Sequence, residues 1–239
     1  FTWRVKRLLI TFEALLIAVY ALVYFTGMLR LGLGLLFLWA ALTPFTVPVC
    51  NIINRPAENS IAKRYVDDAR RILASMPRLT VIGITGSYGK TSTKNFLQAL
   101  LSSKYNVLMT PESYNTTMGV VRTVRESLRP THEIFIAEMG AKNKGDIREI
   151  CELVGPRYGI ITSIGEQHLE TFKTVENIIS TKFELADSIP SDGKLFLNLD
   201  CDYISSRTVN APVVTYGINR EDADYTAFGI AVDGNGSSF

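Results

Sequence analysis

Residues 79–101 decide the fold of this chain and read Leu-Thr-Val-Ile-Gly-Ile-Thr-Gly-Ser-Tyr-Gly-Lys-Thr-Ser-Thr-Lys-Asn-Phe-Leu-Gln-Ala-Leu-Leu. The first seven, residues 79–85, are mostly β-branched or apolar, which is typical of a buried strand. A glycine loop with a Lys-Thr pair follows, and residues 94–101 then have the apolar spacing of a helix. Strand, glycine loop, Lys-Thr and helix, in this order, predict a loop that binds phosphate groups.

The chemistry of this loop points to ATP and Mg²⁺. Its glycines allow backbone N–H groups to converge on phosphate oxygens, and the helix N-terminus adds partial positive charge. Lys90 would neutralise the β- and γ-phosphates, and the hydroxyl of Thr91 or Ser92 would reach the metal. The common long form of the motif has glycine where this chain has Ile84, so a chance glycine-rich turn stays an alternative. The predicted nucleotide-binding residues of the loop are Thr85, Gly86, Ser87, Tyr88, Gly89, Lys90, Thr91 and Ser92.

Other candidate residues follow apolar, strand-like runs. Glu138 ends the run at residues 134–137, and ligands of α/β sheets gather at the carboxyl ends of strands. His168 comes shortly after a similar run, residues 158–164. By itself Lys182 reads as a solvated charge on a helix, and asparagines such as Asn115 and Asn198 are common turn residues.

Six stretches in order resemble the Mur ligases and the related folylpolyglutamate synthases. They are residues 83–92, 113–119, 134–140, 158–170, 179–185 and 197–202. The resemblance implies a P-loop NTPase-like central domain, α/β with a mostly parallel sheet and helices on both faces. It implies catalytic roles for Lys90, Lys182 and His168, metal contacts by Thr91, Glu138, His168 and Lys182, and nucleotide contacts by Asn115, Asn198 and Asp200. It also implies carbamylation of Lys182, which would turn an amine into an anionic oxygen ligand.

The family forms amide bonds through an acyl phosphate, with ATP as the energy source. Residues 138–140 and 165–170 resemble most the branch that joins D-alanyl-D-alanine to a muramoyl tripeptide, a peptidoglycan precursor. The uridine-binding domain of that branch is not visible ahead of the loop, and the pattern stops at Phe239 inside the central domain. We therefore expect a piece of a longer enzyme. A ligase with another acceptor, such as a polyglutamate chain, and a membrane-tethered ATP-binding scaffold stay open; a transporter ATPase is disfavoured because its signature sequence is missing.

The first 55 residues have a different composition. Residues 8–28 are apolar apart from Glu13, and residues 31–53 form a second uncharged run with Pro44 and Pro48, which we expect to kink or end a helix. Basic residues flank both runs on the outer side, against a lone Arg30 between them. We predict a transmembrane hairpin over residues 1–55, with both ends and the ATP-binding domain in the bacterial cytoplasm. An amphipathic connector helix is expected over residues 56–77, and the central domain over residues 78–239.

Charge and cysteines limit the other classes. The net charge of +2 in 239 residues gives no basic stripe, so we expect no nucleic acid partner. Cys50, Cys151 and Cys201 have no metal-ligand or disulfide spacing, which favours buried thiols in a reducing compartment. The resemblance implies ATP, the precursor, D-alanyl-D-alanine and other cell-wall synthesis proteins as partners, and the two apolar runs predict the membrane.

Overall fold

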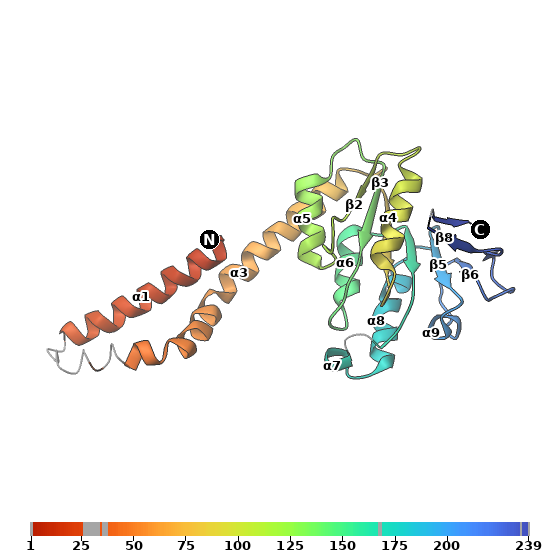
Figure 1. Cartoon of the computed structure of the whole chain (residues 1–239). Coiled ribbons are helices and arrows are strands. Elements are labelled where there is room, and N and C mark those ends of the chain that lie inside the picture. Colours follow the sequence, from red (N-terminus) through yellow and green to blue (C-terminus); the bar gives the residue numbers. More distant parts are fainter. Residues whose placement is uncertain (1, 26–33, 35–37, 167–168, 235, 239) are drawn as a thin grey trace. The chain divides into compact units, whose positions relative to one another are not determined.

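The computed structural model describes the whole chain apart from residues 1, 26–33, 35–37, 167–168, 235 and 239 (Figure 1). It divides into two compact units, Phe1–Tyr65 and Val66–Phe239. The first unit contains helix α1, Trp3–Phe25, and most of helix α3, Thr43–Ala74.

Helices α1 and α3 contact each other through polar side chains. Arg7 forms a 2.7 Å ion pair with Glu58, and the Thr11 hydroxyl donates to the side-chain oxygen of Asn54 at 3.1 Å. Apart from these contacts, the side chains of α1 are mostly apolar and exposed; Phe25, for example, is 85% exposed. Within the described ranges, α1 is the one helix long and apolar enough to cross a membrane, judged by length and composition.

The predicted second span only partly coincides with described residues. Residues 31–33 and 35–37 lie outside them, whereas residues 43–53 belong to α3. This helix continues through Pro48 and Pro56 to Ala74, so neither proline ends it, and Pro44 lies in its first turn, where a missing N–H is tolerated. Helix α3 therefore has no break between the predicted hairpin and the predicted connector.

The second unit is built on a seven-stranded sheet in which every pairing is parallel. The strand order is β2-β3-β1-β4-β5-β6-β7, and a separate antiparallel hairpin, β8-β9, follows. The strands are β1 Thr80–Thr85, β2 Val107–Met109, β3 Ile134–Glu138, β4 Tyr158–Ile161, β5 Lys194–Asn198, β6 Val213–Gly217, β7 Tyr225–Thr226, β8 Ala231–Asp233 and β9 Gly236–Ser238. The predicted α/β fold with a parallel sheet is confirmed.

Helices cover both faces of this sheet. Alternate residues of β1 point to opposite sides, so Val81 joins one apolar cluster and Ile84 joins the other. The first cluster packs against α5, α6 and α8, and the second packs against α4. The helices of this unit are α4 Lys90–Leu101, α5 Thr117–Ser127, α6 Asp146–Val154, α7 Leu169–Phe172, α8 Val175–Asp187 and α9 Asp202–Ser205.

The strand order places a topological switch point at β1. From β1 the chain first adds β2 and β3 on one side and then adds β4 to β7 on the other side. In open parallel sheets ligands bind beyond the carboxyl ends of the strands at such a point. The glycine loop, Thr85 to Gly89, leaves β1 there and leads directly into α4.

Candidate functional site

The glycine loop turns sharply between β1 and α4. Gly86 has a φ of 151°, and Gly89, the N-cap of α4, has a φ of 80°. A side chain at Gly86 would place its Cβ 2.1 Å from the Thr162 hydroxyl oxygen, so the loop requires glycine there. Glycine at these two positions lets the chain enter α4 with its first backbone N–H groups uncapped by a side chain.

Lys90 begins α4 and folds back over the loop. Its ammonium donates to the carbonyl oxygens of Gly86 at 2.7 Å and Ser87 at 3.1 Å. Burial lowers the pKa of Lys90, and the nearby Glu138 carboxylate partly offsets that effect. The loop thus presents a half-buried cation at its centre, as binding of a polyphosphate requires.

Residues from the end of β4 fasten the loop from its other side. The Ser87 hydroxyl donates to the carbonyl of Gly165 at 3.1 Å and accepts from its N–H at 3.0 Å. The Thr162 hydroxyl donates to the carbonyl of Tyr88 at 2.6 Å, and Ser163 bonds to the same peptide segment. These bonds bring the segment that leads to His168 against the loop; His168 itself lies outside the described residues.

Glu138, at the carboxyl end of β3, is the point where the predicted residues meet. Its side chain is 2% exposed. The Thr91 hydroxyl donates to one carboxylate oxygen at 3.1 Å, and the Asn115 amide donates to the other at 3.1 Å. The structure therefore brings a strand-end carboxylate, a hydroxyl from the start of α4 and an asparagine together.

Lys94 is the residue of this group that sequence reasoning missed. Its ammonium lies 2.9 Å from Glu138 Oε2, and its side chain is 1% exposed. The available signal was its spacing, because Lys94 follows Lys90 by four residues and so lies on the same face of α4. A lysine at the polar start of a helix is ordinarily exposed to solvent. Lys94 becomes buried only when the strands assemble and the carboxylate of Glu138 comes to lie beside it.

A cavity of about 430 Å³ opens beside this group. Its lining residues include Lys90, Asn115, Lys142, Asp146 and Lys182. Lys182, on α8, is 5% exposed, and burial together with the charge of Lys90 lowers its pKa to about 8. An appreciable fraction of neutral amine is therefore present near physiological pH.

Glu184, two residues after Lys182, ties α8 to the wall of this cavity. Its buried carboxylate accepts the backbone N–H of Gly145 at 2.7 Å and that of Arg148 at 3.0 Å. These are free donors of the first turn of α6, whose N-cap residue is a glycine without a capping side chain. A carboxylate from another helix therefore caps α6 and fixes the loop that lines the cavity.

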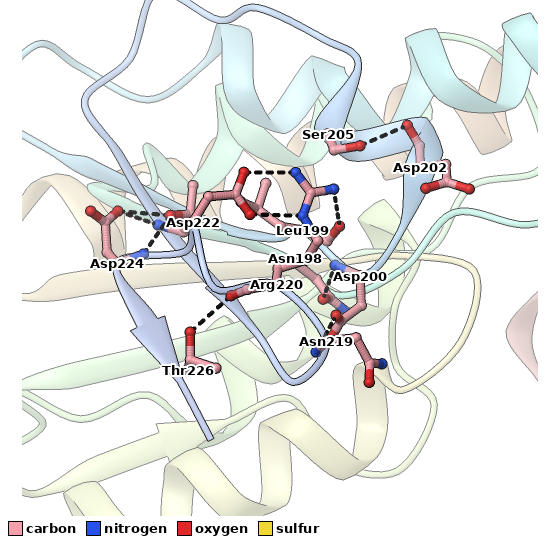
Figure 2. A network of polar contacts seen from close by, with 11 residues as sticks. Asn198, Leu199, Asp200, Asp202, Ser205, Asn219, Arg220, Asp222, Asp224 and Thr226 are labelled. Atoms are coloured by element: carbon pink, nitrogen blue, oxygen red, sulfur yellow. Dashed lines mark hydrogen bonds and ion pairs between the residues drawn. The ribbon is translucent and has the colours of Figure 1, made fainter. Parts of the chain in front are cut away.

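Asn198 and Asp200 lie at the carboxyl end of β5 (Figure 2). Asn198 donates to the Thr162 carbonyl at 3.0 Å and accepts from the Asp200 N–H at 3.0 Å. Asp200 accepts the N–H groups of Ile218 at 2.6 Å and Asn219 at 2.9 Å. The side chains of Asn198 and Asp200 thus hold the ends of β4, β5 and β6 together. To contact a nucleotide as well, they would have to use donor and acceptor positions that these bonds do not occupy.

The donor set near the loop suits Mg²⁺. Thr91 and Glu138 supply a hydroxyl and a carboxylate oxygen, which are the ligand types that this hard cation prefers. Among the described residues, His, Cys, Asp and Glu side chains form no group of three or more that could hold a metal. A site here would thus need ligands besides Thr91 and Glu138, such as water and phosphate oxygens. The three cysteines are free; Cys50 and Cys151 are buried, and Cys201 is half-buried.

Comparison with known proteins gives the family. Residues 84–239 match the Mur ligase middle domain. UDP-N-acetylmuramoyl-tripeptide--D-alanyl-D-alanine ligase of Mycobacterium bovis is 40% identical over 122 residues, which is 51% of this chain and 24% of the relative. The ligase of the same name from Synechocystis is 31% identical over 206 residues, covering 81% of this chain and 45% of the relative.

One solved structure indicates the same family as these two relatives. The crystal structure of MurF ligase from Thermotoga maritima in complex with ADP superposes with a TM-score of 0.67 and 28% identity, covering 73% of this chain and 40% of that one. The chain thus spans less than half the length of each of these three proteins. The resemblance seen in the sequence is confirmed, and the chain belongs to the Mur ligase family.

Proposed function

We propose that this chain is the ATP-binding part of an ATP-dependent amide-bond ligase of peptidoglycan precursor synthesis. The observation that supports it most is the meeting of Lys90, Thr91 and Glu138 at the carboxyl ends of β1 and β3. The names of the two relatives and of the ADP-bound structure support the same reading. In this proposal residues 85–92 hold the phosphates, and Asn115, Asn198 and Asp200 contact the nucleotide.

Thr91 and Glu138 would hold Mg²⁺, with His168 and Lys182 completing the metal site as the resemblance implies. When bound, the metal would neutralise negative charge on the phosphate oxygens. Lys90 would stabilise the charge that develops on the transferred phosphoryl group. For this it has to exchange its bonds to the Gly86 and Ser87 carbonyls for bonds to phosphate oxygens.

The proposed reaction has two steps. An oxygen of the acceptor carboxylate attacks the γ-phosphorus, the bond from that phosphorus to the β,γ-bridging oxygen breaks, and ADP leaves. The amine nitrogen of the second substrate then attacks the carbonyl carbon of the acyl phosphate. The carbon–oxygen bond to phosphate breaks, the nitrogen loses a proton, and the products are the amide and inorganic phosphate. The chain's own part is to align the first two reactants, because positioning and electrostatics dominate phosphoryl transfer.

Lys182 is proposed to act as a carbamate. The nitrogen of a neutral amine attacks carbon dioxide and releases a proton to solvent, which leaves the carbamate anion, and the lowered pKa of about 8 supplies the neutral amine near neutral pH. Lys182 faces the same cavity as Lys90, where an anionic group would pair with the neighbouring cation. The buried position would protect the carbamate from water.

The proposed acceptor is a muramoyl tripeptide, and the proposed amine is D-alanyl-D-alanine, as the relatives' names indicate. The cavity offers the cations Lys90 and Lys142 to a negatively charged carboxylate. Residues outside this chain would hold the rest of both substrates, since the matched parts of the two relatives are only 24% and 45% of their lengths.

We further propose that α1 and the second apolar run anchor the enzyme in the bacterial cytoplasmic membrane, with the ATP-binding domain in the cytoplasm. The support is the length and apolar exposure of α1 and the basic residues at the outer ends of both runs. Other cell-wall synthesis proteins would then be neighbours. Extraction of membranes with alkaline carbonate tests this: the anchored protein stays in the pellet, and release into the supernatant contradicts the anchor.

The ligase is tested with detergent-solubilised full-length protein, a muramoyl tripeptide and D-alanyl-D-alanine. ADP release and amide formation should depend on the dipeptide, and Lys90→Ala and Lys182→Ala should abolish both. Lys104→Ala, which alters an exposed lysine beyond the end of α4, is the control and should keep the activity. ATP binding without dipeptide-dependent turnover would contradict the proposed substrates and favour another acceptor or a scaffold.

A further inference from the structure

Lys94 occupies an unusual place on α4. Its side chain is 1% exposed, whereas Phe96 and Leu100 of the same helix are 72% and 73% exposed. Burying a charged side chain under a helix while apolar side chains face solvent reverses the usual distribution. A buried ammonium is tolerated only when it is paired and hydrogen-bonded, so its partners explain its position.

The ammonium of Lys94 has two partners from different elements. It lies 2.9 Å from Glu138 Oε2, at the end of β3, and it donates to the main-chain carbonyl of Glu112 at 2.6 Å. Glu112 has a φ of 42°, a left-handed conformation that is uncommon for a residue other than glycine. The bond from Lys94 therefore stabilises a strained turn in the loop between β2 and α5.

The turn at Glu112 leads directly to Asn115. Asn115 follows Glu112 by three residues, and its amide donates to Glu138 Oε1, the carboxylate oxygen that Lys94 does not contact. Lys94 thus fixes the Glu138 carboxylate directly at one oxygen, and through the loop it fixes the donor at the other. With Lys94 removed, a buried carboxylate would keep only neutral donors, Thr91 and Asn115, and would be free to rotate away from the phosphate loop.

We propose that Lys94 is a positioning residue of the nucleotide site, which holds the Glu138 carboxylate beside Thr91 and thereby sets how strongly Mg²⁺ increases the affinity for ATP. This inference rests on the proposed function, because it takes Glu138 as a Mg²⁺ ligand. Lys94 does not line the cavity, and its role is to orient Glu138 and, through the loop, Asn115, which does line it. Its effect should therefore appear in the Mg²⁺-dependent part of nucleotide binding and not in the Mg²⁺-free part.

The test compares a fluorescent ATP analogue binding to the 239-residue chain in Mg²⁺ and in EDTA. Lys94→Met, which keeps the unbranched side chain up to Cε and removes the ammonium, should reduce the Mg²⁺-dependent gain in affinity by about tenfold or more, as expected for loss of a charged hydrogen bond. Affinity in EDTA should stay within about twofold of wild type. Lys104→Met, at an exposed lysine, is the matched control and should leave both affinities unchanged.

Thermal unfolding of each variant separates positioning from mere stabilisation. A folded Lys94→Met chain that melts earlier but keeps the full wild-type Mg²⁺ gain would overturn the inference. If Lys94→Met does not fold, Lys94→Gln, which keeps a neutral donor, answers the same question: a reduced gain supports the inference and an unchanged gain overturns it. A wild-type chain without any Mg²⁺ gain would contradict the proposed function and the inference together, whereas a gain retained in the variants contradicts the inference alone.

Discussion

Ser87 and Gly165 exchange two hydrogen bonds: the Ser87 hydroxyl donates to the Gly165 carbonyl at 3.1 Å and accepts from the Gly165 N–H at 3.0 Å. One residue lies in the phosphate loop after β1, and the other lies in the segment after β4. The pair therefore joins the loop to the segment that leads to His168. Substrate-binding geometry at the switch point depends on such bonds between neighbouring strand ends.

Ser87→Ala should weaken nucleotide binding by about fivefold, because it leaves both Gly165 groups without this partner, at a net cost of about 1 kcal/mol. The measurement is titration calorimetry with ATP and Mg²⁺. Ser191→Ala, at an exposed serine, is the control. Equal affinities of Ser87→Ala and wild type would show that the loop keeps its shape without this pair.

Gly86→Ala should abolish nucleotide binding and lower the melting temperature. A Cβ at this position would lie 2.1 Å from the Thr162 hydroxyl oxygen, and the φ of 151° is itself unfavourable for alanine. Gly145→Ala is the matched control, since Gly145 has a φ of 96° but has nothing within 4 Å of the new Cβ. It should cost about 1–2 kcal/mol through backbone strain alone. A Gly86→Ala chain that still binds ATP would contradict the close approach of Thr162 to the loop.

Glu184→Gln should lower the free energy of unfolding by about 1–3 kcal/mol, because its amide group can accept only one of the two N–H groups that the carboxylate now accepts. Chemical denaturation measures the change. Glu152→Gln, at an exposed position on α6, removes the same charge without touching the cap and should have little effect. A Glu184→Gln chain as stable as wild type would mean that α6 does not need this cap.

Stability should depend on pH through Lys182. Its pKa is lowered from 10.5 to about 8, so between these values the unfolded chain binds more protons than the folded one, and stability rises with pH. Below pH 8 the cost of the buried charge is fully present, at about 3 kcal/mol. In buffer depleted of carbon dioxide, Lys182→Met should be more stable than wild type at pH 7 and lose this advantage towards pH 10.5. A Met variant that is less stable at pH 7 would contradict this assignment.

The sequence predicted much of the frame of this domain. The order of strand, glycine loop and helix located β1 and α4, and apolar runs ending in polar residues located β3 and β4. The short strands β2, β6 and β7 have two to five residues and no clear alternation, so pattern alone does not reveal them. Of the two prolines expected to kink or end a helix, Pro48 does not end α3, because a long helix tolerates the loss of single backbone hydrogen bonds.

Only part of the candidate site could be predicted from the sequence. Glu138 ends β3 and Thr91 lies at the start of α4, just after the loop that leaves β1. The parallel pairing of β1 with β3 brings them together, and the sequence shows where these strands end. Lys94 and Glu184 act through burial and through partners far along the chain, which no local pattern contains. Asn198 is at the expected strand end, yet its amide is already bonded to neighbouring backbone, a detail that only the fold provides.

The central claim is that the loop from Thr85 to Ser92 binds ATP with Mg²⁺ through Lys90. Titration calorimetry of the 239-residue chain with ATP and Mg²⁺, beside Lys90→Ala, tests it most directly. The account predicts saturable binding of one ATP per chain by wild type and at least about tenfold weaker binding by Lys90→Ala, because a charged hydrogen-bond donor is lost. Equal affinities for the two proteins, or the absence of binding by a folded wild-type chain, would contradict it.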